Sequence, residues 1–209
     1  PEWHPRTPFG AKVASYALRG DHETLLVDPL APDGDADALI AALAPALSER
    51  ILIVLTIPYH VRSSEPIWER LRDAHETTIH GHPAVAKRLR DTSGFREMYG
   101  GVALRSGTVP IHIGNPRRHE TPLFVPEHRA LVLGDAIVET EGALRVWLQQ
   151  PLTPSRRTWY ATRLRPSLAP LLDFDVERVL VTHGQPVLSG GQTALVAALD
   201  SDPWYHRPN

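Results

Sequence analysis

Residues 119–136 read HETPLFVPEHRALVLGDA, and this stretch decides the fold. Residues 121–125 and 130–133 are short runs of apolar and β-branched side chains separated by a Pro-Glu-His turn, a pattern typical of a β-hairpin. Paired antiparallel strands bring their open ends together, so His119 before the first strand and Asp135 after the second are expected at one rim of a sheet. A histidine and a carboxylate at such a rim predict a metal site.

A second stretch, RVLVTHGQP at residues 178–186, repeats this arrangement. Residues 179–181 form a short apolar strand, His183 follows it, and Gly184 and Pro186 then break the strand. This order of strand, polar residue and strand breaker makes His183 the third candidate ligand.

With these motifs the chain resembles the metallo-β-lactamase fold superfamily of metal-dependent hydrolases over nearly its whole length. In that family a His precedes a hairpin, a Gly-Asp pair ends the next strand and bridges two metals, and a late strand ends in His-Gly. His119, Asp135 and His183 match these positions in order. The patterning by itself supports a mixed α/β domain, and the resemblance implies an αββα four-layer sandwich of two mixed β-sheets with outer helices. It also implies that Asp28 orients the metal-binding loop; the alternative is an ordinary turn before Pro29.

Composition is compatible with a single domain spanning residues 1–209. The chain has 209 residues, 42% of them hydrophobic and 22% charged, which is enough to bury a substantial core. A net charge of -2 predicts no strong attraction to nucleic acid or membrane. The absence of cysteine excludes disulfides and thiolate ligands. No signal-peptide pattern is seen, so we expect a cytoplasmic protein with a small-molecule substrate or ligand, and homo-oligomers stay open.

The loop after the apolar strand at residues 50–55 departs from the family. There the family has T-H-x-H-x-D-H, the source of most ligands of a two-metal centre, whereas residues 56–62 read TIPYHVR. Aligned without gaps, Ile, Tyr, Val and Arg replace all four ligands. Aligned with a loop two residues shorter, His60 takes the place of the last His. Neither alignment rebuilds a two-metal centre, since Ile has no lone pair and Tyr is a poor ligand for most hydrolytic metals.

The reduced ligand set predicts one divalent metal ion, Zn first and Fe or Mn as alternatives. His60, Asp135 and His183 would form a 2-His-1-carboxylate set, with His119 as a fourth ligand or an acid/base. Such an ion activates water, and Asp135 and His119 would be the catalytic residues of a hydrolase acting on an ester, thioester, lactone or phosphodiester.

The competing hypothesis needs no metal. Arg62 would neutralise Asp135 through an ion pair, and the protein would be a catalytically silent family member that binds a ligand or partner. In either case Tyr59, Arg62 and His82 are expected to line the pocket. The sequence His80-Gly81-His82-Pro83 is interpreted as a strand-to-helix turn rather than a metal pair, with His80 or His82 lining the pocket as a minority reading.

Periodicity and turn residues predict the remaining elements. The expected helices lie at residues 35–47, 64–72, 84–90, 159–172 (irregular) and 192–199. The expected strands lie at residues 12–18, 24–27, 50–55, 76–79, 101–104 paired with 109–113, and within 139–150 around a turn at 141–142; residues 151–157 are expected to be a loop and 202–209 a tail.

Overall fold

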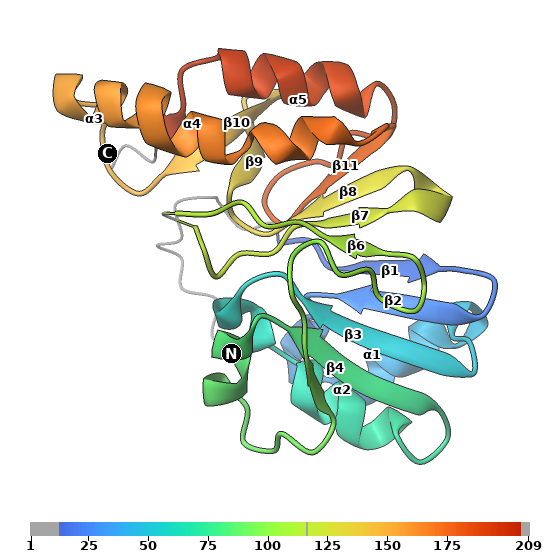
Figure 1. Ribbon diagram of the computed structural model, residues 1–209. Coiled ribbons are helices and arrows are strands. Elements are labelled where there is room, and N and C mark those ends of the chain that lie inside the picture. The colour runs from blue at the N-terminus through green and yellow to red at the C-terminus, as the bar shows by residue number, and fades with distance from the viewer. Residues whose placement is uncertain (1–12, 116, 206–209) are drawn as a thin grey trace. The chain divides into compact units, whose positions relative to one another are not determined.

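A computed structural model describes residues 13–115 and 117–205 (Figure 1). The chain forms two compact units. The first unit is Ser15–Pro110, and the second is Ile111–Asn209 together with the segment that ends at Ala14. The first unit has one five-stranded sheet, the second contains two groups of strands, and each unit has its own hydrophobic core. The organisation of residues 1–209 as one domain stays a prediction.

The first unit is built on a five-stranded sheet. Its strands lie in chain order: β1 (Tyr16–Arg19), β2 (Glu23–Val27), β3 (Arg50–Leu55), β4 (Glu76–Gly81) and β5 (Phe95–Glu97). The β1–β2 pair is antiparallel and the other pairs are parallel. The carboxyl ends of β2 to β5 therefore share one edge, where ligands bind in open α/β sheets.

Two helices contribute to the core of this unit. Helix α1 (Ala36–Leu43) starts at Asp35, whose side chain accepts a hydrogen bond from the Ala38 amide at 2.9 Å, and a 3-10 turn (Ala44–Ala46) containing a proline ends it. Helix α2 (Ser64–Leu71) buries an apolar face. Core members include Leu26, Ile53, Leu55, Ile67, Trp68, Leu71 and Ile79.

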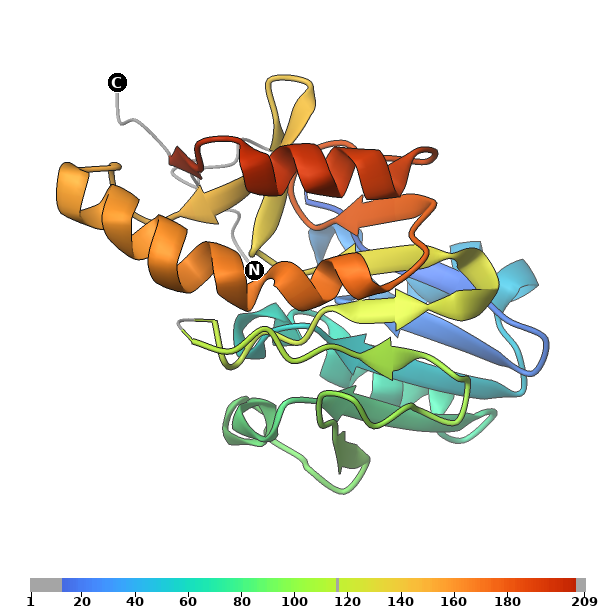
Figure 2. The same cartoon turned by 45° about the horizontal axis from the view of Figure 1, so that its top comes forward.

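The second unit contains two groups of strands. Strands β11 (Arg178–Val181), β8 (Ala130–Leu133) and β7 (Leu123–Val125) lie side by side in this order, and β12 (Trp204–Tyr205), β10 (Ala143–Leu148) and β9 (Ile137–Thr140) form the other group. Helix α5 (Gly191–Asp200) packs on β10 and β11. The helical run from α3 (Pro154–Trp159) through a π-turn (Tyr160–Leu164), α4 (Arg165–Ser167) and a 3-10 helix (Ala169–Asp173) lies alongside α5 (Figure 2).

Several expected elements are wrong. The predicted helix at 84–90 is a 3-10 helix (Pro83–Arg88), residues 101–104 form no strand, and the expected strand at 109–113 is reduced to β6 (Val109–Pro110). The predicted loop at 151–157 contains the start of α3. There Pro154 occupies the first helical turn, where its missing N–H costs nothing, and the Thr153 side chain caps the Arg156 amide.

Strand β4 is two residues longer than expected, so His80 belongs to the strand and not to the turn. Its Nε2 atom lies 2.9 Å from the Thr78 hydroxyl. Burial, and to a lesser extent the charge of Arg96, lowers the pKa of His80 to about 4. In the unfolded state the ring has an ordinary pKa near 6.5 and becomes protonated at about pH 6. In the folded state it stays neutral at that pH.

The protein is expected to lose stability on acidification partly through His80. Between pH 7 and pH 5 the unfolded state gains the proton and the folded state does not, so the free energy of unfolding falls by about 1–2 kcal/mol from this residue. Urea unfolding at both pH values should show a smaller loss in His80→Gln than in the parent. Equal losses in the two proteins would contradict this prediction; His22→Gln, at an exposed position, is the matched control.

None of the described helices combines the length and the apolar character needed to span a bilayer.

Candidate metal centre

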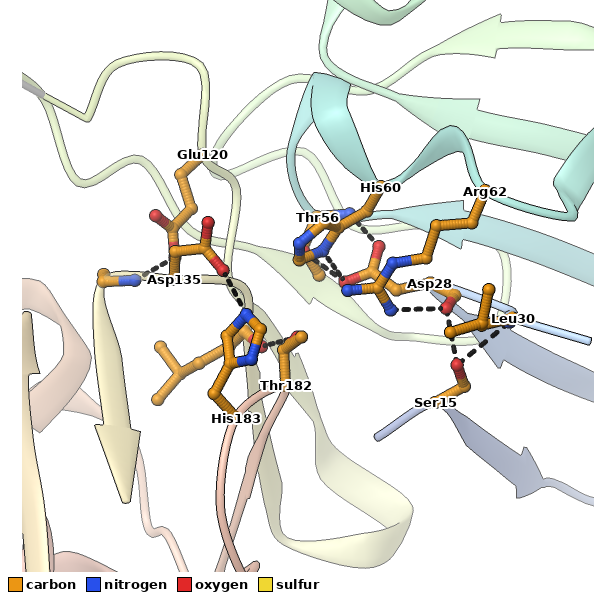
Figure 3. Close-up of polar contacts among 12 residues, drawn as sticks. Ser15, Asp28, Leu30, Thr56, His60, Arg62, Glu120, Asp135, Thr182 and His183 are labelled. Atoms are coloured by element: carbon orange, nitrogen blue, oxygen red, sulfur yellow. Dashed lines mark hydrogen bonds and ion pairs between the residues drawn. The ribbon is translucent and has the colours of Figure 1, made fainter. Parts of the chain in front are cut away.

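Asp135 and His183 are brought together by two neighbouring strands. Strands β8 and β11 are parallel, and Leu133 is paired with Val181. Each candidate ligand lies two residues beyond one of these paired residues. The Asp135 Oδ1 and His183 Nε2 atoms are 3.3 Å apart (Figure 3). Two of the three residues that were expected to share one site, Asp135 and His183, therefore lie side by side.

The spacing of these two atoms fits a shared metal ion. Bonds of about 2.0–2.1 Å at a tetrahedral angle place two ligand atoms about 3.3 Å apart. A carboxylate oxygen and an imidazole nitrogen are also a donor set suited to Zn, Fe or Mn. The Asp135 side chain is 18% exposed and the His183 side chain is 9% exposed, so both are largely shielded from solvent but still accessible to water. The two side chains could thus serve as two ligands of a metal ion.

The backbone conformation at position 184, together with its close approach to Glu139, explains why glycine follows His183. Its φ is +95°, and a Cβ atom there would lie 2.4 Å from the Glu139 carbonyl oxygen. Glu139 holds the turn by donating its amide hydrogen to the His183 carbonyl at 2.9 Å and accepting the Gln185 amide at 2.8 Å. Only glycine permits this approach of two backbones.

Gly184→Ala is expected to destabilise the protein by at least about 2 kcal/mol, because the added Cβ combines a left-handed backbone with steric overlap. Chemical denaturation measures the effect. Gly142→Ala, which also has a positive φ (+80°) but open space around it, is the control and should cost less. Equal costs would show that the contact with Glu139 is unimportant.

In the first unit, a buried carboxylate organises the loop after β3. The Asp28 carboxylate accepts hydrogen bonds from the Thr56 amide at 2.9 Å and the Thr56 hydroxyl at 2.5 Å, and lies 2.8 Å from His60 Nδ1. Asp28 and His60 are 2% and 5% exposed. An ionised carboxylate can only accept, so Nδ1 donates the hydrogen, and in the neutral ring Nε2 then carries the lone pair. This is the arrangement in which proteins orient a metal-binding or acid/base histidine.

The backbone of Asp28 is also held under strain. Its φ is +47°, and its carbonyl oxygen accepts hydrogen bonds from Ser15 Oγ at 2.7 Å and Arg62 Nη1 at 3.1 Å. Arg62 itself has a φ of +40° and a ψ of -119°. Strained residues that surroundings over-determine in this way gather at functional sites. Arg62 thus supports Asp28; its proposed ion pair with Asp135, which belongs to the second unit, stays a prediction.

The side chain of His119 is exposed, whereas that of the next residue, Glu120, is buried. The His119 side chain is exposed, and its Nε2 atom accepts a hydrogen bond from Arg118 at 3.2 Å. Glu120 is buried, and its Oε1 atom accepts the amide hydrogen of Ala136, the residue after Asp135, at 2.8 Å. Burial raises the pKa of Glu120; Arg117 opposes this rise, and Asp135 adds to it. Sequence reasoning missed Glu120, although an acid directly before an apolar strand was a usable signal.

The residues expected to line a pocket are found at the carboxyl edge of the first sheet. Tyr59 is 71% exposed, and the Arg88 guanidinium lies over its ring at 4.5 Å. The Nδ1 atom of His82 accepts the Ala84 amide hydrogen at 3.0 Å, so this side chain caps the start of the 3-10 helix Pro83–Arg88. Their part in a pocket stays a prediction, as does joint metal binding by His60, Asp135 and His183, because His60 belongs to the first unit and the others to the second.

Comparison with solved structures identifies the fold. TTHA1623, solved in a di-iron-bound form, is 20% identical with a TM-score of 0.60 over 90% of this chain and 94% of that chain. The chemotaxis sensor ODP, solved as a peroxy diiron species, is 14% identical with a TM-score of 0.64 over 93% and 90%. ST1585 from Sulfolobus tokodaii, an archaeal metallo-β-lactamase superfamily protein, is 17% identical with a TM-score of 0.59 over 90% and 78%.

These likenesses confirm the predicted fold class: the chain has the metallo-β-lactamase fold, a mixed α/β architecture. No protein-family model matches the sequence, and no curated protein matches it.

Proposed function

We propose that the protein is a metal-dependent hydrolase with a reduced, mononuclear site. In this proposal Asp135 and His183 hold one divalent ion, and His60 completes the set as the resemblance implies. The observation that carries the proposal is the 3.3 Å approach of the Asp135 and His183 ligand atoms at the ends of two paired strands. The metals named for two similar structures, TTHA1623 and the sensor ODP, add support from the fold.

The chemistry divides between the ion and the chain. A divalent ion in such a site lowers the pKa of its water toward 7 and so supplies a nucleophile for an ester, thioester, lactone or phosphodiester. Asp28 fixes the His60 tautomer, so that Nε2 presents a lone pair. The negative charge of Asp135 favours the binding of a cation over the binding of an uncharged molecule. His119, being exposed, is proposed as a substrate-side acid/base rather than a ligand.

The test is metal content together with activity. Protein purified without chelator should carry about one ion per chain, and a panel of ester, thioester, lactone and phosphodiester substrates should reveal hydrolysis. Chelation should abolish that hydrolysis, and Zn, Mn or Fe should restore it. His60→Ala should weaken binding of the ion relative to the parent. A parent protein that binds no ion at micromolar free metal would overturn the proposal and favour the metal-free ligand-binding alternative.

A further inference from the structure

The backbone of Ala136, the residue after Asp135, is held on both sides by hydrogen bonds within the second unit. Its amide hydrogen, on Ala136, is donated to Glu120 Oε1 at 2.8 Å (Figure 3). The Ala136 carbonyl accepts the Trp147 amide hydrogen at 3.1 Å. Ala136 is fully buried, so water cannot replace either partner.

Arg117 closes this set of contacts into a ring. Its Nη1 atom donates to Glu120 Oε2 at 3.0 Å, and its Nη2 atom donates to the Trp147 carbonyl at 2.9 Å. The guanidinium also lies over the Trp147 ring at 5.1 Å. Because the Glu120 and Arg117 side chains are only 3% and 16% exposed, their ion pair is poorly screened by solvent. The ring therefore joins three separate segments of the chain around one residue, Ala136.

We propose that Glu120 and Arg117 act as a positioning pair that fixes the Ala136 peptide and thereby directs the Asp135 carboxylate toward His183. The part of this inference that concerns metal rests on the function proposed above. Glu120 is a positioning residue and not a ligand, since each of its carboxylate oxygens is already engaged, one by a backbone amide and one by a guanidinium. The opposite charge of Arg117 also prevents a second acid beside Asp135 from adding to the negative charge of the site.

Amide hydrogen exchange of the metal-free protein, followed by NMR, tests the pairing directly. In Glu120→Ala the Ala136 amide loses its acceptor, and its exchange is expected to accelerate at least about tenfold relative to the amides of β8. In Glu120→Gln the side-chain carbonyl still accepts, so protection of Ala136 should be largely retained. Glu127→Ala removes an exposed acid from the turn of the same hairpin and serves as the matched control. Normalising to β8 separates a local effect from general destabilisation.

Metal titration of the same variants tests the consequence for the site. Loss of a residue that orients a metal ligand costs about 10–100-fold in metal affinity, so Glu120→Ala should bind the ion about 10–100-fold more weakly than the parent. Glu120→Gln should recover most of this loss. Glu127→Ala should bind the ion as tightly as the parent. Unchanged protection of Ala136 in Glu120→Ala would overturn the inference, as would equal losses in the Ala and Gln variants. Failure of the parent to bind metal would instead remove the proposed function and leave the exchange result to decide the pairing.

Discussion

Asp135→Asn is expected to reduce metal affinity by more than about 100-fold, beyond the cost of changing an outer partner, and to abolish hydrolysis. The substitution keeps the size and shape of the side chain but removes its negative charge and makes one of its two terminal atoms a donor. His183, the other proposed ligand in the second unit, would bind a metal as a neutral ring. The site would then lose the only charge that this pair offers to a cation.

Metal content and thermal unfolding measure this effect together. Added Zn should raise the melting temperature of the parent, because a ligand bound only to the folded state stabilises it, and should leave that of Asp135→Asn nearly unchanged. Asp173→Asn, a change of the same type at an exposed position of the same unit, should behave like the parent. Equal metal content in the parent and in Asp135→Asn would show that Asp135 is not a ligand.

Asp28→Ala is expected to destabilise the protein by about 3–5 kcal/mol. The substitution leaves the Thr56 amide, the Thr56 hydroxyl and His60 Nδ1 buried without their acceptor. It also places alanine at a φ of +47°, which aspartate and asparagine tolerate better. Asp28→Asn keeps the backbone preference and isolates the contribution of the carboxylate. Since an amide has one acceptor oxygen, this variant should still lose about 2 kcal/mol.

Urea unfolding followed by tryptophan fluorescence gives these free energies, and ring-nitrogen NMR reports the His60 tautomer. The parent should show hydrogen on Nδ1, and Asp28→Asn should show a mixture. Asp33→Asn is the matched control, because Asp33 also has a positive φ of +51° but is exposed; its cost should stay within about 0.5 kcal/mol. A cost for Asp28→Asn no larger than that of the control would contradict the role given to the carboxylate.

The strands predicted most accurately from the sequence were those whose hydrophobic pattern allowed only one interpretation. Strands β3 and β8 were predicted with their observed bounds, because a continuous apolar run between turn residues has few alternatives. Strand β11 begins one residue earlier than expected. A proline produced one error, because a proline in the first turn of a helix resembles a loop signal and so concealed α3. Apolar residues alone suggested a strand at 101–104, where no continuous ladder forms.

The candidate site was predictable as far as strand register reaches. Asp135 and His183 meet because both follow paired strands. That these two residues share one site was implied by the resemblance and not by their spacing in the sequence. The pairing of Asp28 with His60 depends on the left-handed backbone conformation of Asp28. The sequence around Asp28 contains no pattern that predicts this conformation. The inward position of Glu120, next to the exposed His119, depends on which way a loop turns. The resemblance directed attention to the histidine and away from its neighbour.

The parallel register of β8 and β11 limits where this chain can change length. Asp135 and His183 each lie two residues beyond the paired Leu133 and Val181, so one residue inserted between Leu133 and Asp135, or between Val181 and His183, would separate the two proposed ligands. Natural relatives that retain the site should therefore tolerate insertions in the turn at 126–128 and after α5, whereas these two spacers should keep a constant length.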